Sequence, residues 1–390
     1  MPTRIDPPPL GAADRISPLR RGSRRRGLVA RIATAGAVVA IATGAGVGPV
    51  AARPATDSVS VFASAPAPGH PFGIAVGDGQ VYVSTSAGDF FADPAHGGHL
   101  NSDNERVFTY GEDGSLVRTT VIDTADNSDM GLFGLALDGN PGPKHRLFVA
   151  DMNGRILTVG LGNHPAAPKV FSQVPADTGL AGDWMLSMWN DLVFDKTGNL
   201  YVPDDKPRIW RVSPDGSAHI WFTDPRLLGL FGFAGGPLGG RIDPTGQWLY
   251  ISITLAAEFA PSPDATIYRI RLVDHPTAGD MQLVHRFVAT PDPTIAPPQA
   301  TGLAFAKSGN LYVSLLGPNQ VAVLDPAGNE IRRISDPRFH SPWGLAFMGN
   351  SLLVTNGDLE PGDHPDAWKI FKVAVGETGL PLNRPRVPVN

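Results

Sequence analysis

The sequence predicts an all-β fold, a six-bladed β-propeller of four-stranded blades, from three observations. One hairpin phrase recurs six times along the 390 residues. The spacing of its copies suits the blades of a propeller. An N-terminal strand is left over that can complete the last blade, so the ring has a means of closing.

The hairpin phrase is clearest at Asn190–Asp205 and Thr301–Leu315, which read NDLVFDKTGNLYVPDD and TGLAFAKSGNLYVSL. Each joins two apolar, alternating runs through a tight turn that contains Gly-Asn, a pattern typical of a β-hairpin. Looser copies begin at Phe72, Phe133, Leu238 and Trp343.

The six copies start 42 to 63 residues apart. A propeller blade takes about 40–50 residues, so we expect insertions in the longer gaps. The third copy shows the plan of a blade. Its four strands are predicted at Asp191–Phe194, Asn199–Pro203, Arg208–Val212 and Ala218–Phe222.

The last blade lacks a fourth strand, because only a Pro-rich tail follows Trp368–Val375. The unassigned run SVSVFA at Ser58–Ala63 precedes the first blade and can supply that outer strand, which leaves no unpaired edge. A solenoid or a sandwich leaves this run unused. We therefore predict one propeller over residues 53–380 and a Pro-rich tail over residues 381–390.

Residues 1–52 are predicted to be an export signal. Ile32–Ala52 are uncharged, and Val50-Ala51-Ala52 supplies the small residues that a signal peptidase needs. Ser23-Arg24-Arg25 resembles a twin-arginine signal. The alternative is an uncleaved anchor, since 21 residues can just span a bilayer. We expect a secreted or extracytoplasmic monomer that begins near Arg53 and has no membrane contact after cleavage.

Composition excludes several classes of function. The chain has no cysteine, so a disulfide, a thiolate zinc site and a cysteine nucleophile are ruled out. It also lacks the signatures of serine hydrolases, zincins and nucleotide enzymes. Residues 1–52 carry eight arginines and two aspartates, and the remainder carries 24 basic and 35 acidic side chains, a net charge of −11. This negative body argues against nucleic acid as a partner and leaves small molecules and cations.

Two motifs resemble known families. Leu147–Ile156, LFVADMNGRI, is similar to the phrase of NHL repeats, and Trp189–Asp195, WNDLVFD, resembles SMP-30/gluconolactonase/LRE-like propellers. The resemblance covers residues 58–376. For the second family it implies a hydrolase whose divalent cation is held by a Glu, an Asn and an Asp. Asn190 stands at the Asn position, while Phe72 and Leu238 stand at the other two.

The long connections of the predicted ring gather on one face, which we name the long-loop face and expect to hold the site. The first residue of each inner strand points into the central channel near that face. This predicts pocket-lining roles for Phe72, Phe133, Thr301 and Trp343. For the aromatic residues the alternative is ordinary packing between blades.

Oxygen ligands in an acidic body suit Ca²⁺ or Mg²⁺. The candidate metal ligands are Asn190, Asp151, Asp183 and Glu258, and the candidate catalytic residues are Asp204 and His340. Each acid has a structural alternative. Asp151 can cap its own hairpin, Asp204 and Asp205 can form a solvated loop, and Asn190 can stabilise a turn.

Two functions therefore remain open at this point. One is a metal-assisted hydrolase of a lactone or related small ester, with Asn190 as a cation ligand. The other is a non-catalytic propeller that binds a small molecule or a protein on its long-loop face.

Overall fold

The computed structural model describes the chain from Asp57 to Pro388, with gaps. The described ranges are 57–66, 69–86, 105–122, 131–151, 154–162, 167–174, 189–230, 235–260, 264–290, 292, 295–357 and 364–388. The export signal predicted for residues 1–52 lies outside them. Within these ranges, the structure has no helix of the length and apolarity that a membrane crossing needs.

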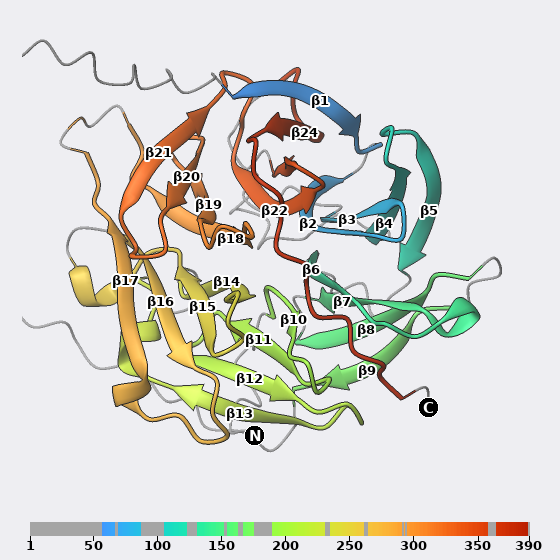
Figure 1. The fold of residues 1–390 in the computed structure, drawn as a ribbon, viewed down its shortest axis with the longest axis horizontal. Helices are drawn as coiled ribbons and strands as arrows, with labels where there is room; N and C mark the ends of the chain where they lie inside the picture. The colour runs from blue at the N-terminus through green and yellow to red at the C-terminus, as the bar shows by residue number, and fades with distance from the viewer. Residues whose placement is uncertain are drawn as a thin grey trace, which may run out of the picture. The chain divides into compact units, whose positions relative to one another are not determined.

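The described chain forms six antiparallel sheets of four strands, which confirms the predicted propeller (Figure 1). Blade 1 contains β2 (His70–Gly77), β3 (Gln80–Ser86), β4 (Glu105–Gly111) and β5 (Leu116–Ile122). Blade 2 contains β6 (Leu132–Leu137), β7 (Arg146–Asp151), β8 (Arg155–Gly160) and β9 (Lys169–Gln173). Blade 3 contains β10 (Val193–Phe194), β11 (Leu200–Asp204), β12 (Arg208–Val212) and β13 (Ala218–Thr223).

The remaining blades follow the same order. Blade 4 contains β14 (Pro237–Ile242), β15 (Trp248–Ile253), β16 (Ala265–Arg271) and β17 (Met281–Phe287). Blade 5 contains β18 (Gln299–Phe305), β19 (Leu311–Leu316), β20 (Gln320–Leu324) and β21 (Glu330–Ser335). Blade 6 contains β22 (Pro342–Met348), β23 (Ser351–Asn356), β24 (Lys369–Ala374) and, as its outer strand, β1 (Ser58–Ser64).

The ring closes through the N-terminal strand, as the sequence predicts. β1 pairs with β24 in an antiparallel register that runs from Ser58 opposite Ala374 to Ser64 opposite Lys369. Without β1, the edge of β24 would present unpaired N–H and C=O groups to solvent.

The residue predicted to face the channel from each inner strand is named the ring residue. In five blades a glycine directly follows the ring residue, and the ladder between the first and second strands is bulged there. These glycines are Gly73, Gly134, Gly239, Gly302 and Gly344. A Cβ on any of them would lie 2.0 to 2.4 Å from backbone of the next blade's inner strand. Real Cβ atoms do not approach so closely, so the absence of a side chain lets neighbouring inner strands meet.

In blades 1, 4 and 6 a hydroxyl joins the inner strand to that of the next blade at the same point. The Gly344 N–H donates to Thr355 Oγ1 at 2.8 Å, and this hydroxyl donates to the Phe72 carbonyl oxygen at 2.8 Å. Ser84 links blade 1 to blade 2 in the same way, and Ser252 links blade 4 to blade 5. Buried backbone groups that the bulge removes from the ladder are thereby satisfied.

The C-terminal tail lies across the face that carries the short turns (Figure 1, dark red). Its Leu380 N–H donates to the Phe305 carbonyl at 2.8 Å, and Asn383 Nδ2 donates to the Phe194 carbonyl at 2.9 Å. Further along, Gly139 N–H donates to the Pro385 carbonyl at 2.8 Å. The tail therefore contacts blades 5, 3 and 2 in turn and spans the end of the central channel.

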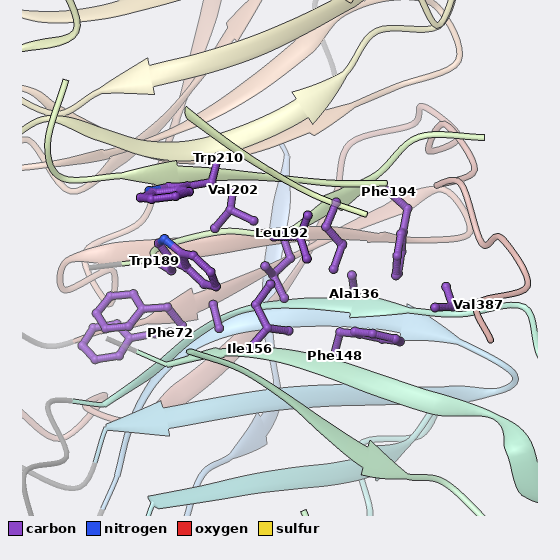
Figure 2. Close-up of a cluster of buried hydrophobic side chains, with 14 residues drawn as sticks. Phe72, Ala136, Phe148, Ile156, Trp189, Leu192, Phe194, Val202, Trp210 and Val387 are labelled. Carbon is purple, nitrogen blue, oxygen red and sulfur yellow. The ribbon is translucent and has the colours of Figure 1, made fainter. Parts of the chain in front are cut away.

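The core between blades 2 and 3 extends through the depth of the ring. Figure 2 shows a buried cluster that has Phe72 at one end and Val387 of the tail at the other. Trp189 and Trp210 pack in it with ring centroids 5.9 Å apart. The same apolar cluster therefore supports both the long-loop end of the channel and the tail end.

The close approach of inner strands predicts a large cost for a single methyl group. In Gly344→Ala, the new Cβ would lie 2.3 Å from the Phe72 carbonyl oxygen, and we expect a loss of about 2 kcal/mol in the free energy of unfolding. Urea denaturation measures this loss. The control is Gly279→Ala, whose Cβ would meet only Thr277 Oγ1 at 3.6 Å. Equal stability of the two variants would contradict the account.

Candidate functional site

The predicted ring residues do lie at the starts of the inner strands. Phe72, Phe133, Leu238 and Thr301 are buried, and Trp343 is partly exposed. Asn190 is buried just before β10 and is held there because the Asn190 N–H donates to the Pro203 carbonyl of β11 at 3.1 Å. We name the end of the channel that these residues surround the mouth.

Three of the ring residues, Phe72, Phe133 and Trp343, pack on one another and are named the aromatic triad. Phe72 and Phe133 stack with centroids 4.9 Å apart and planes 6° apart. Trp343 meets their edges at 4.8 and 5.6 Å. The triad thus joins blades 6, 1 and 2 across the mouth, and only Trp343 keeps exposed surface for a ligand. Such contacts stabilise the ring in addition to the apolar area that they bury.

Thr301 is a structural member of the ring. Its side chain is fully buried, and its hydroxyl lies 3.3 Å from the Pro342 carbonyl oxygen and 3.4 Å from that of Trp343. It therefore links blade 5 to blade 6 rather than facing open space.

Asn190 forms a pair with Asp205 at the mouth. Asn190 Nδ2 donates to Asp205 Oδ1 at 3.1 Å and to the Pro237 carbonyl oxygen of blade 4 at 3.2 Å. Both side chains are buried, with 4% and 5% of their surfaces exposed. Across the described residues, Asn190 Oδ1 and Asp205 Oδ2 receive no hydrogen bond, so each is available to a bound group.

The environment of Asp205 favours its neutral form. Burial raises the pKa of Asp205 well above its usual range, and the neighbouring Asp204 carboxylate raises it further. The hydrogen bond from Asn190 and the charge of Lys206 lower the pKa, but they do not reverse the shift. A protonated carboxyl donates as well as accepts, which gives this pair both kinds of hydrogen-bonding capacity.

Asp204 and Asp151 occupy equivalent places in blades 3 and 2, and each is joined to an arginine four residues later. Asp204 Oδ2 accepts from Arg208 Nε at 2.6 Å and from Trp210 Nε1 at 2.7 Å. Asp151 Oδ2 accepts from Arg155 Nε at 2.7 Å. Buried, paired carboxylates of this kind hold the second and third strands of a blade together. The catalytic role of Asp204 and the metal role of Asp151 remain predictions.

The two remaining candidate metal ligands are Glu258 and Asp183. Glu258 lies on the 3₁₀ helix η4 (Ala257–Phe259). Burial raises its pKa, and the charge of Arg226 lowers it. Asp183 lies outside the described residues. Within the described ranges, no three His, Asp or Glu side chains gather as a metal would require.

His340 and His364 meet at the end of blade 6 on the long-loop side. Their rings stack with centroids 4.2 Å apart and planes 11° apart. The His340 backbone N–H donates to Asn356 Oδ1 at 3.0 Å. The sequence predicted a catalytic role for His340, and the structure places it against His364 in blade 6, whereas Asp204, the other candidate catalytic residue, lies in blade 3.

Asp205 is the site residue that sequence reasoning did not select. The signal was present, because Asp204 ends the second strand of the hairpin that Asn190 begins, and Asp205 follows it directly. The bridge between Trp189 and Asp204 fixes the register that brings Asp205 to Asn190.

The raised pKa of Asp205 predicts a pH-dependent stability difference between the protein and Asp205→Asn. A raised carboxyl pKa contributes stability below the unfolded-state pKa, and this contribution is lost as the pH rises through the folded-state pKa. Asn does not titrate. We therefore expect Asp205→Asn to gain stability relative to the unmodified protein as the pH rises above about 4, the ordinary pKa of aspartate. Urea denaturation over that range measures the difference, and a flat or opposite trend would show that Asp205 is ionised.

No protein-family model matches this chain, and no curated protein matches it. Solved structures do. A luciferin-regenerating enzyme has a TM-score of 0.57 at 13% identity and covers 85% of this chain and 99% of its own. A calcium-binding regucalcin from Agrobacterium tumefaciens has the same TM-score at 16% identity, with the same coverage. A putative gluconolactonase has a TM-score of 0.53 at 16% identity and covers 84% of this chain and 95% of its own. The chain is a six-bladed β-propeller structurally similar to propellers of the SMP-30/gluconolactonase/LRE type.

Proposed function

We propose that the mouth on the long-loop face binds a small, uncharged organic molecule. The observation that carries this proposal is the Asn190–Asp205 pair, which is buried at the end of the channel with one unoccupied oxygen on each side chain. Polar side chains at such depth normally use their polar atoms, so two adjacent oxygens that accept no hydrogen bond from the described residues support a ligand there.

The chemistry of the pair selects the ligand class. Asn190 Oδ1 accepts a hydrogen bond, and a protonated Asp205 Oδ2 donates one. The pair therefore suits a molecule with a donor next to an acceptor, such as a hydroxylated lactone. The partly exposed Trp343 offers an apolar surface at the same end of the channel for the body of that molecule.

Metal-assisted hydrolysis of a lactone or small ester is the second candidate. Two residues favour this hydrolase. Asn190 stands at the position of the Asn that holds the cation in SMP-30/gluconolactonase/LRE-like propellers, and an oxygen of Asp205 lies next to it. The rest of the set does not fit. Phe72 and Leu238 occupy the Glu and Asp positions, and Phe72 is stacked in the aromatic triad. Two oxygens are far fewer than the roughly 6–8 that surround Ca²⁺, and they would leave most of the coordination of Mg²⁺ to water. We therefore derive no hydrolytic step.

Calorimetric titration separates the two candidates. The probes are glucono-δ-lactone, γ-butyrolactone and dihydrocoumarin, each with and without Ca²⁺. The proposal predicts saturable binding of a lactone after chelation, with the Kd about tenfold weaker in Asn190→Ala because one hydrogen bond to the ligand is lost. The control is Glu112→Gln, an exposed acid on a turn of blade 1. Lactone turnover that chelation abolishes and Asn190→Ala removes would favour the hydrolase instead.

We also propose that the protein is exported and processed near Arg53, on the evidence of the uncharged run and small residues before it. The intact mass of protein recovered from the culture supernatant is expected to match a chain that begins near Arg53. Recovery of the full-length chain in membranes alone would contradict export with cleavage.

A further inference from the structure

A cavity of about 410 Å³ lies at the other end of the central channel, between the inner strands and the C-terminal tail. Inner strands of blades 1, 4, 5 and 6 form its walls, and Thr378–Leu382 with Arg384 form its cover. A volume of this size accommodates a small organic molecule. The cavity does not include the Asn190–Asp205 pair.

The walls of this tail cavity are mostly apolar. Ile74, Phe305 and Leu345 lie on three different blades, and Leu380 and Leu382 cover them from the tail. Such a lining favours the hydrocarbon part of a ligand.

Two arginines interrupt the apolar lining. Arg241 on β14 has only 9% of its side chain exposed and uses Nη1 alone in the described structure, with Asp191 Oδ2 and the Gly240 carbonyl each at 2.5 Å. Asp191 Oδ2 also accepts a hydrogen bond from the Gly240 N–H at 3.0 Å, so the carboxylate of this ion pair has two partners. The Nε and Nη2 groups of Arg241 make no hydrogen bond with the described residues, and the residue lines the cavity.

Arg384 brings a second guanidinium from the tail. Its Nη1 contacts the Asp78 carboxylate at 3.0 and 3.2 Å. Its Nη2 is buried without a hydrogen-bond partner in the described part of the chain. A Cβ on Gly77 would lie 1.3 Å from this nitrogen, so the guanidinium rests directly on the backbone of blade 1. A buried donor of a charged group destabilises the folded state when it has no partner.

The charge around the cavity favours an anion. Among the described residues that line it, three are cations, Arg241, Arg384 and Lys307, and none is a carboxylate. The Asp191 carboxylate neutralises the charge of Arg241. The Asp78 carboxylate is 51% exposed, so it neutralises the charge of Arg384 only in part. Guanidinium groups bind carboxylates through pairs of parallel hydrogen bonds.

We propose that the tail cavity binds a small monocarboxylate with an apolar body. The Nε and Nη2 groups of Arg241 hold the carboxylate, Arg384 adds its positive charge from the tail, and the apolar walls enclose the hydrocarbon. The tail is then part of the site, because it supplies Arg384 and two of the leucines. The proposal does not depend on the function of the mouth.

The test is calorimetric titration of the full protein with octanoate. We expect saturable binding of one octanoate, and binding at least about tenfold weaker for octan-1-ol, which has the same chain without the charge. Arg384→Gln should weaken octanoate binding at least about tenfold. Arg241 is left intact, because its removal would leave Asp191 as an unpaired buried charge.

Two further variants locate the ligand. Ala346→Leu places extra carbon in the cavity wall and should abolish octanoate binding. Arg333→Gln is the matched control, since Arg333 is 32% exposed and paired with Glu330, and Arg384 is 29% exposed and paired with Asp78. It should bind octanoate as the unmodified protein does.

Three outcomes would overturn the proposal. They are no saturable octanoate binding, equal binding of octanoate and octan-1-ol, and octanoate binding that is unchanged in both Arg384→Gln and Ala346→Leu. A fourth outcome, octanoate binding that Asn190→Ala removes and Ala346→Leu retains, would place the anion at the mouth and overturn the proposal as well.

Discussion

The contact between neighbouring inner strands is the constraint on which this molecule depends. Five blades place a glycine directly after the ring residue, because the backbone of the next blade occupies the position of a Cβ. The ladder is bulged at this point, and in blades 1, 4 and 6 a hydroxyl such as Thr355 satisfies the freed backbone groups. One local device therefore fixes both the spacing of the blades and the side chains at the mouth.

Blade 3 departs from this device, and both proposed sites follow from the departure. It has Asn190-Asp191 where the other blades have a ring residue and a glycine. Asn190 reaches Asp205 at the mouth. Asp191 accepts from the Gly240 N–H and pairs with Arg241, so its carboxylate replaces the missing hydroxyl link to blade 4 and directs an arginine to the tail cavity. The two ends of the channel thus acquire polar groups from one pair of adjacent residues.

The blade architecture could be predicted from the sequence because it depends on local signals. Alternating runs and Gly-Asn turns identify each hairpin, and the predicted third strand of blade 3, Arg208–Val212, matches the structure residue for residue. The leftover run at Ser58–Ala63 was sufficient to predict closure of the ring. The glycines after the ring residues are also visible in the sequence. Their requirement for glycine could not be predicted, because it arises from contact with the inner strand of the next blade.

The candidate site was less predictable because it depends on register and on distant contacts. Asp204 and Asp205 are chemically identical neighbours, yet one faces Arg208 and the other faces Asn190. Only the pairing of the strands decides which carboxyl is free. Composition likewise predicted a Pro-rich tail but not its course, which depends on partners such as Gly139 and Phe194, each about 190 residues or more earlier in the chain.

The central claim is that Asp205 is a neutral, hydrogen-bonding carboxyl at the mouth. Infrared difference spectroscopy of the unmodified protein against Asp205→Asn at neutral pH tests it most directly. The account predicts the carbonyl stretch of a protonated carboxylic acid in the unmodified protein alone. A difference spectrum that contains only carboxylate stretching bands would contradict it, and the mouth would then hold a buried negative charge suited to a cation.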